Sequence, residues 1–137
     1  MSATDPAQVL DHPWGAPPSA RYEELARKFR PTIERIRAGA VERDLQHRLP
    51  HEEIRWLREA GFTTLRLPAE FGGFHASIPE LFALLIELGA ADTNVVNIIR
   101  AHLGSVEEVL NSRDAAWRPR WTDTLGRGDL IGAGASE

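Results

Sequence analysis

Residues 67–94 read LPAEFGGFHASIPELFALLIELGAADTN, and they carry a turn signal followed by the best helix-start signal in the chain. The Gly72-Gly73 pair predicts a turn or a close approach of two backbone segments. Ser77 and Glu80 then stand at capping-box spacing, so a helix is expected to begin here. The residues that follow, 81–90, are apolar on nearly every side, which predicts a helix in the centre of the domain.

Helical patterns also precede this stretch. Apolar residues recur at steps of three or four over 19–40, which predicts a long helix with a kink near Arg27–Pro31. A second helix is expected to begin at Pro50 and to stop at Gly61. Residues 62–68 are rich in apolar and β-branched types and predict an extended or irregular connection.

Two more helices are expected after it. Asp92 or Thr93 caps the first of them, 94–110, which offers five core candidates: Val95, Ile98, Ile99, Val106 and Val109. A shorter helix is predicted to start at Ser112 and to bend at Pro119. The fold class is therefore all-α, with about five helices.

The two ends of the chain differ from this helical body. Residues 1–18 hold four prolines and no sustained period, and we expect an arm there. The helical domain then covers 19–126. Residues 127–137 include a short apolar run that predicts a single strand. A lone strand is not stable by itself, so we expect it to be the first strand of a truncated middle β-domain.

Composition excludes several classes of protein. The chain has 137 residues, a formal net charge of −4 and no cysteine. An acidic chain lacks the clustered cations of a nucleic-acid binder, and without thiols it has no disulfide or thiolate metal site. The start, MSATDPAQVL, is not a signal peptide, and the longest apolar run, 81–86, is too short to span a membrane. We expect a soluble, cytoplasmic protein.

One metal motif begins but is not completed. His51-Glu52 opens an H-E-x-x-H pattern, but Arg55 stands where the second histidine is required. No metal site is therefore predicted.

An ordered set of segments carries a family resemblance. These segments are Arg43-Asp44, Leu49-Pro50, Glu59–Phe62, Leu67–Gly73 and Gly128–Glu137. Together they resemble the N-terminal helical domain of the acyl-CoA dehydrogenase family of flavoproteins. The proline–x–glutamate–aromatic–glycine–glycine motif within 67–73 is the most recognisable part.

The resemblance implies a flavin, FAD or FMN, held between a middle β-domain and a C-terminal helical bundle. The N-terminal helices would wall off the pocket for a small-molecule substrate, such as an acyl-CoA. The catalytic carboxylate would come from the C-terminal bundle, so we expect none in this chain and no activity from it alone. Ser136 and Glu137 would contact the flavin, and the enzyme would be a homo-oligomer.

The resemblance also implies a set of pocket residues on the helix 94–110. They are Val96, Asn97, Arg100, Ala101, His102 and Gly104. Spacings of three and four place Asn97, Arg100 and Gly104 on one stripe. Arg100 could instead pair with Glu107 or Glu108.

His102 has two possible roles. It could transfer protons at the flavin edge, since its ordinary pKa lies near neutrality. It could equally be a histidine at the edge of the core that is satisfied by a backbone carbonyl.

The resemblance leaves two branches of the family open, dehydrogenation of a thioester and flavin-dependent oxygenation. Asn111–Asp114 replaces the segment typical of dehydrogenases, and together with Arg100, His102 and Glu107 this is closer to the monooxygenase branch, which includes oxidisers of sulfur compounds. A different class is also open. A free-standing helical module without catalysis could self-associate through exposed tryptophans and the unpaired strand.

Overall fold

The computed structural model describes residues 19–132, and every regular element in this part is helical. The order is α2 (Ala20–Ala38), α3 (Ala40–Leu45), α4 (His51–Ala60), η1 (Phe62–Thr64), η2 (Ala69–Phe71), α5 (Ile78–Ala91), α6 (Thr93–Asn111) and α7 (Trp117–Gly126), where η denotes a 3-10 helix. The expectation of an all-α fold is thereby confirmed. The predicted arm, 1–18, lies outside the described residues.

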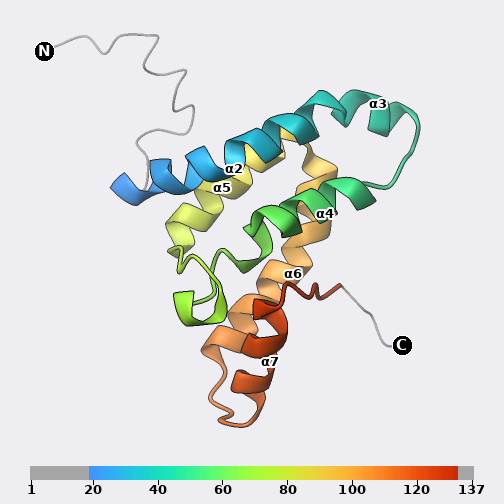
Figure 1. Ribbon diagram of the computed structural model, residues 1–137. Coiled ribbons are helices and arrows are strands. Elements are labelled where there is room, and N and C mark those ends of the chain that lie inside the picture. The colour runs from blue at the N-terminus through green and yellow to red at the C-terminus, as the bar shows by residue number, and fades with distance from the viewer. Residues whose placement is uncertain (1–18, 133–137) are drawn as a thin grey trace, which may run out of the picture.

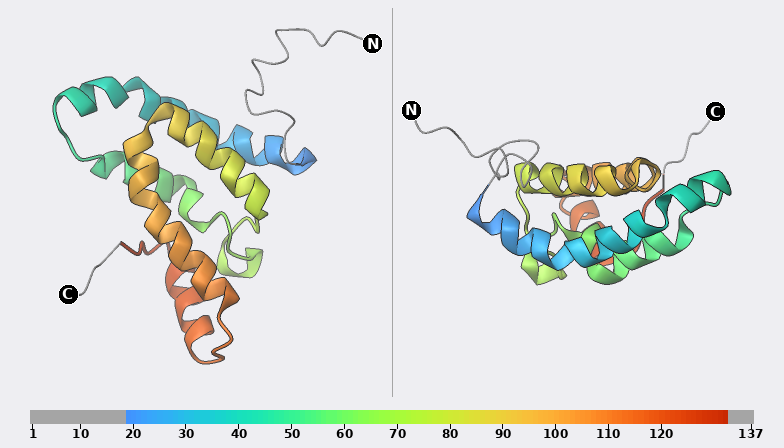
Figure 2. Two further views of the ribbon diagram at one scale, coloured as in Figure 1. Left: turned by 180° about the vertical axis from the view of Figure 1, so that it is seen from behind. Right: turned by 90° about the horizontal axis from the view of Figure 1, so that it is seen from above.

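The helices form two layers. Seen from above, α5 and α6 lie over a second layer that contains α2, α3 and α4 (Figure 2). The helix α7 packs against the far end of α6 (Figure 1). Between the layers the rings of Phe29 and Phe62 meet edge to face, with centroids 5.2 Å apart. Both side chains are fully buried, so this contact joins α2 to η1 at the centre of the core.

The double glycine makes the turn that the sequence predicts. Gly72 has φ of +76°, a left-handed conformation that favours glycine. At Gly73 a Cβ atom would lie only 2.0 Å from the carbonyl oxygen of Leu67. The chain therefore folds back on itself at this point, and both predicted reasons for glycine, the turn and the close approach, are confirmed.

The predicted capping box at the start of α5 is also confirmed. The Ser77 hydroxyl accepts from the Glu80 N–H at 3.3 Å, and the Glu80 carboxylate accepts from the Ser77 N–H at 2.7 Å. The hydroxyl of Ser19, which caps α2, donates to the same carboxylate at 2.5 Å. Burial alone would raise the pKa of Glu80, but the hydrogen bonds from Ser19 and Ser77 outweigh it and lower that pKa.

Ser77→Ala is expected to lower the free energy of unfolding by about 1 kcal/mol, because the Glu80 N–H loses its acceptor in the first turn of α5. Urea unfolding followed by circular dichroism measures this change. Ser105→Ala, on α6, is the control and should stay within about 0.5 kcal/mol of the parent. Equal stability of the two variants would contradict the role of the cap.

Two predictions about helices are wrong. The helix expected over 19–40 is interrupted at Gly39, and α3 follows it as a separate element. The last helix begins at Trp117, because Asp114 accepts from the Ala116 and Trp117 N–H groups and starts it there. Pro119 consequently lies in the first turn, where its missing N–H costs no helical hydrogen bond.

The burial of α5 and α6 also differs from expectation. On α5, Phe82 is 57% exposed and Ile86 is 40% exposed, because only one side of this helix faces the core. On α6, the core candidate Ile98 is 45% exposed.

The strand expected in 127–137 is not formed by the residues that can be described. Residues 127–128 form a turn and 129–132 have no regular structure, since no second strand in the described part of the chain pairs with them. The remaining five residues, 133–137, lie outside the described range.

Candidate functional site

The outer face of α6 carries five of the six predicted pocket residues. Asp92 starts the helix by accepting from the Asn94 and Val95 N–H groups. Further along, three of the predicted residues are exposed: Asn97, Arg100 and Gly104. The other two, Val96 and Ala101, are half-buried. A Cβ atom at Gly104 would meet no other atom within 4 Å. The structure thus brings these residues together on one stripe of α6, which is open at Asn97, Arg100 and Gly104, whereas Val96 at its edge packs against the main core.

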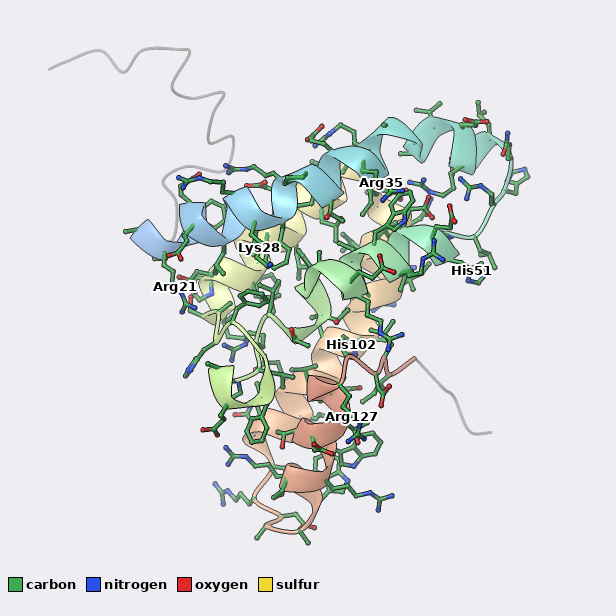
Figure 3. The ribbon with its side chains drawn as sticks, viewed as in Figure 1. Arg21, Lys28, Arg35, His51, His102 and Arg127 are labelled. Atoms are coloured by element: carbon green, nitrogen blue, oxygen red, sulfur yellow. The ribbon has the colours of Figure 1, made fainter. Side chains whose placement is uncertain are left out.

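The sixth residue, His102, points away from this stripe. Its side chain lies where α6 meets η1 and the segment after α7 (Figure 3). It is 2% exposed. Its Nε2 lies 2.9 Å from the carbonyl oxygen of Thr63, and its Nδ1 accepts from the Ile131 N–H at 3.3 Å. Both ring nitrogens are therefore engaged by backbone groups, as in the second of the two roles considered for this residue.

Burial lowers the pKa of His102 below its ordinary value, and the hydrogen bond to Thr63 offsets part of that effect. The folded protein therefore holds the ring neutral at pH values where the unfolded chain already binds a proton. The contribution of the neutral His102 ring to stability is fully present above the pKa of histidine in the unfolded chain, about 6.5. It is lost as the pH falls from there towards the pKa of His102 in the folded protein.

We expect the free energy of unfolding to fall by up to about 1.4 kcal/mol for each pH unit below 6.5, until the folded pKa is reached. Urea unfolding at several pH values between 7 and 5 measures how the free energy of unfolding changes with pH. In His102→Gln this slope should disappear, whereas His51→Gln, at an exposed position, should retain it. A slope that persists in His102→Gln would assign it to another group.

Arg100 forms an ion pair with neither Glu107 nor Glu108, the two partners that the sequence allowed. Glu107 instead pairs with Arg66, whose Nε lies 2.5 Å from Oε1. The Arg100 Nε donates to the Asn97 side-chain oxygen at 2.9 Å. Within residues 19–132 no carboxylate lies within salt-bridge distance of Arg100, so its charge remains available at the surface of the stripe.

A hollow of about 240 Å³ adjoins the start of α6. It is lined by α3, the connection to α4 and the first turns of α6: Arg43, Asp44, His47, Arg48, Leu49, Pro50, Asn94, Asn97 and Ile98. Asn97 belongs both to this hollow and to the outer stripe of α6. The stripe therefore carries polar side chains at this end and small residues at the other end, towards Gly104.

A buried ionic cluster lies behind the hollow. The Arg43 guanidinium lies 2.7 Å from Glu53 and 2.5 Å from Asp92, and it also donates to the Ile36 carbonyl at 3.0 Å. All three charged side chains are at most 5% exposed. This cluster joins α3, α4 and the start of α6, and it fixes where the stripe begins.

The sequence did not predict this cluster. A signal was present, because Glu53 stands four residues before the buried Leu57 and hence on the apolar face of that helix.

Comparison with known proteins now decides the family. The profile of the acyl-CoA dehydrogenase N-terminal domain matches residues 20–129, from the first residue of α2 to just beyond α7. The chain belongs to the acyl-CoA dehydrogenase family. The matched range contains the double-glycine turn, the capping box and the outer stripe of α6.

Two curated relatives of this acyl-CoA dehydrogenase-family chain are informative. SfnC of Pseudomonas putida, named as an FMNH2-dependent monooxygenase, is 32% identical over 119 residues, which are 84% of this chain and 28% of the relative. YdbM of Bacillus subtilis strain 168, named as an acyl-CoA dehydrogenase, is 37% identical over 70 residues, 51% of this chain and 18% of the relative. The chain thus spans less than a third of the length of either relative. No solved structure matches it.

The hollow beside α6 in this family member is not built for a flavin ring. A flavin ring needs a largely apolar slot with a few placed hydrogen-bonding groups, whereas the hollow beside α6 is lined mainly by charged and amide side chains. His102 has no free ring nitrogen to offer. Ser136 and Glu137, the residues predicted to contact the flavin, lie outside the described residues, and their role stays a prediction.

No helix in 19–132 is long and apolar enough to cross a membrane. The same residues hold no group of three or more side chains suited to a metal ion.

Proposed function

We propose that this chain contributes the helical wall of a substrate pocket in a flavin-dependent oxidoreductase. The observation that carries the proposal is the open outer stripe of α6 within a domain of the acyl-CoA dehydrogenase family. Small residues such as Gly104 leave room beside the helix, and Arg100 is the one charged member of the stripe. A stripe of this kind suits a ligand that has an apolar part and a polar group.

FAD or FMN would supply the redox chemistry when bound. The chain's own residues would bind and orient the substrate and exclude water. The Arg100 guanidinium, held by Asn97, can donate to a carbonyl, sulfoxide or phosphate oxygen of a ligand. Ala101 and Gly104 would accept the apolar part, and the layer of α2 to α4 behind α6 would close that side to water.

Of the two reactions, oxygenation with reduced flavin has the better support. The match to the FMNH2-dependent monooxygenase covers 84% of the chain, against 51% for the acyl-CoA dehydrogenase. The polar pair of Asn97 and Arg100 also suits a plain fatty acyl chain poorly, since such a chain offers no acceptor to the other N–H groups of the Arg100 guanidinium.

The test begins with the protein as its natural gene produces it. Flavin should co-elute with the purified protein, or added FMN or FAD should bind to it. Two assays then separate the reactions: bleaching of bound flavin by octanoyl-CoA without oxygen, and oxygen-dependent conversion of a small organic sulfide with reduced FMN. We expect the second. Bleaching alone would establish dehydrogenation, and a protein that binds no flavin in any form would overturn the proposal.

A second candidate function, self-association, has an observation of its own. Ile78, Phe82 and Ile86 form an exposed apolar stripe along α5, and each is at least 40% exposed. Light scattering after gel filtration would give the mass of the protein in solution. A homo-oligomer that Phe82→Glu converts to a monomer, without loss of helicity, would support this interface. A monomeric parent protein would exclude it.

A further inference from the structure

We propose that His102 is a positioning residue that ties the backbone of Ile131 to η1 and so sets the path of the chain as it leaves the helical body. The segment leads on in sequence to Ser136 and Glu137, and its use at a flavin rests on the proposed function above. The tie itself does not depend on that function.

The two partners of the ring fix its form. A carbonyl oxygen can only accept, so the nitrogen beside Thr63, Nε2, carries the proton. An amide N–H can only donate, so the nitrogen that faces Ile131, Nδ1, is unprotonated. The neutral ring therefore serves both partners at once, and protonation at Nδ1 would remove the acceptor that Ile131 needs.

The tie joins three segments that are distant in the sequence. Thr63 lies in η1, directly after α4, and His102 lies in the middle of α6. Ile131 lies after α7, beyond Gly128, whose φ of +82° turns the chain. The Ile131 side chain packs against a small core of Leu67, Val106, Val109 and Leu125.

Apart from the packing of the Ile131 side chain, little else in the described part of the chain holds this segment. Residues 129–132 have no helix or strand, and the bond from Ile131 to His102 is their one hydrogen bond to another described residue. The ring is also buried on the opposite side of α6 from Arg100 and Gly104. Its two hydrogen bonds account for both nitrogens, which leaves neither for proton transfer to a ligand. Holding the backbone is the role that this geometry supports.

Two substitutions separate the two hydrogen bonds. In His102→Asn the side-chain oxygen lies near the place of Nδ1 and can still accept from Ile131, but the donor to Thr63 is lost. In His102→Gln the amide nitrogen lies near the place of Nε2 and can still donate to Thr63, but the acceptor for Ile131 is lost. Each variant loses one hydrogen bond, so a general loss of stability should be similar in both.

Amide hydrogen exchange of the 137-residue chain, read by NMR, is the measurement. We expect exchange at Ile131 to speed up about tenfold or more in His102→Gln and to stay within a few-fold of the parent in His102→Asn. The Gly128 amide, which donates to Leu125, is the internal control and should stay protected in both. Equal exchange at Ile131 in the two variants, or an unprotected Ile131 amide in the parent, would overturn the tie.

A measurement on the parent protein covers the case in which a variant fails to fold. Nitrogen chemical shifts of the His102 ring distinguish its two neutral tautomers. A proton on Nε2 is expected, and a proton on Nδ1 would contradict the proposal, since that nitrogen could no longer accept from Ile131. Neither measurement involves flavin or turnover, so failure of the tie and failure of the proposed function can be told apart.

Discussion

Gly73→Ala is expected to lower the free energy of unfolding by about 3 kcal/mol or more. The added Cβ would lie 2.0 Å from the Leu67 carbonyl oxygen and 2.5 Å from the Leu67 carbonyl carbon, both of which are backbone atoms. They cannot rotate away as the end of a side chain can. Relief of the clash must therefore open the turn at 67–76 that connects α4 to α5. Thermal unfolding should show a fall in Tm of roughly 10 °C or more.

Gly104→Ala is the matched control for this substitution. A Cβ at Gly104 would meet nothing within 4 Å, and the residue lies inside α6. Alanine should raise the free energy of unfolding there by about 0.5–1 kcal/mol, because it favours the helix over glycine. If Gly73→Ala were as stable as the parent, the close approach in the turn would be wrong.

Arg43→Met is the second substitution with a large expected effect. It would leave the carboxylates of Glu53 and Asp92 buried without their guanidinium partner, a loss of about 3–5 kcal/mol. One oxygen of Glu53, Oε2, already has no hydrogen-bond partner among the described residues, so loss of Arg43 would leave this buried carboxylate still less satisfied. Urea unfolding measures the change.

The control is Arg48→Met, which removes a guanidinium that is 47% exposed and 3.8 Å from the same carboxylate of Glu53. It should cost less than about 1 kcal/mol. Adding Glu53→Gln to Arg43→Met should recover part of the loss, because it removes one of the two unpaired charges. A similar cost for Arg43→Met and Arg48→Met would show that the buried cluster does not hold the three helices together.

Local signals in the sequence predicted most of the fold. The capping box at Ser77, the stop at Gly61 and the turn at the double glycine are set by residues close together in the chain, and each formed as expected. The apolar run 81–90 predicts a helix that is buried on all sides, but Phe82 in this run is exposed. An apolar run cannot show whether a helix has neighbours on all sides, and α5 has them on one side only.

The candidate site was predictable to a lesser degree. The spacing of Asn97, Arg100 and Gly104 placed them on one stripe, and the structure agrees. The partners of Arg100 and His102 could not be inferred from sequence, because they depend on tertiary contacts. Glu107 forms its ion pair with Arg66, and the imidazole ring of His102 is hydrogen-bonded by the backbone of Thr63 and Ile131.

Filling the outer face of α6 tests the claim that this face forms a substrate wall. Gly104→Leu would extend a side chain into the space beside the helix, where a Cβ atom meets no other atom within 4 Å. We expect unchanged helicity and flavin content, and a rise in KM of about tenfold or more for the substrate that the natural protein turns over, either the organic sulfide with reduced FMN or octanoyl-CoA. A KM equal to that of the parent protein would contradict the claim.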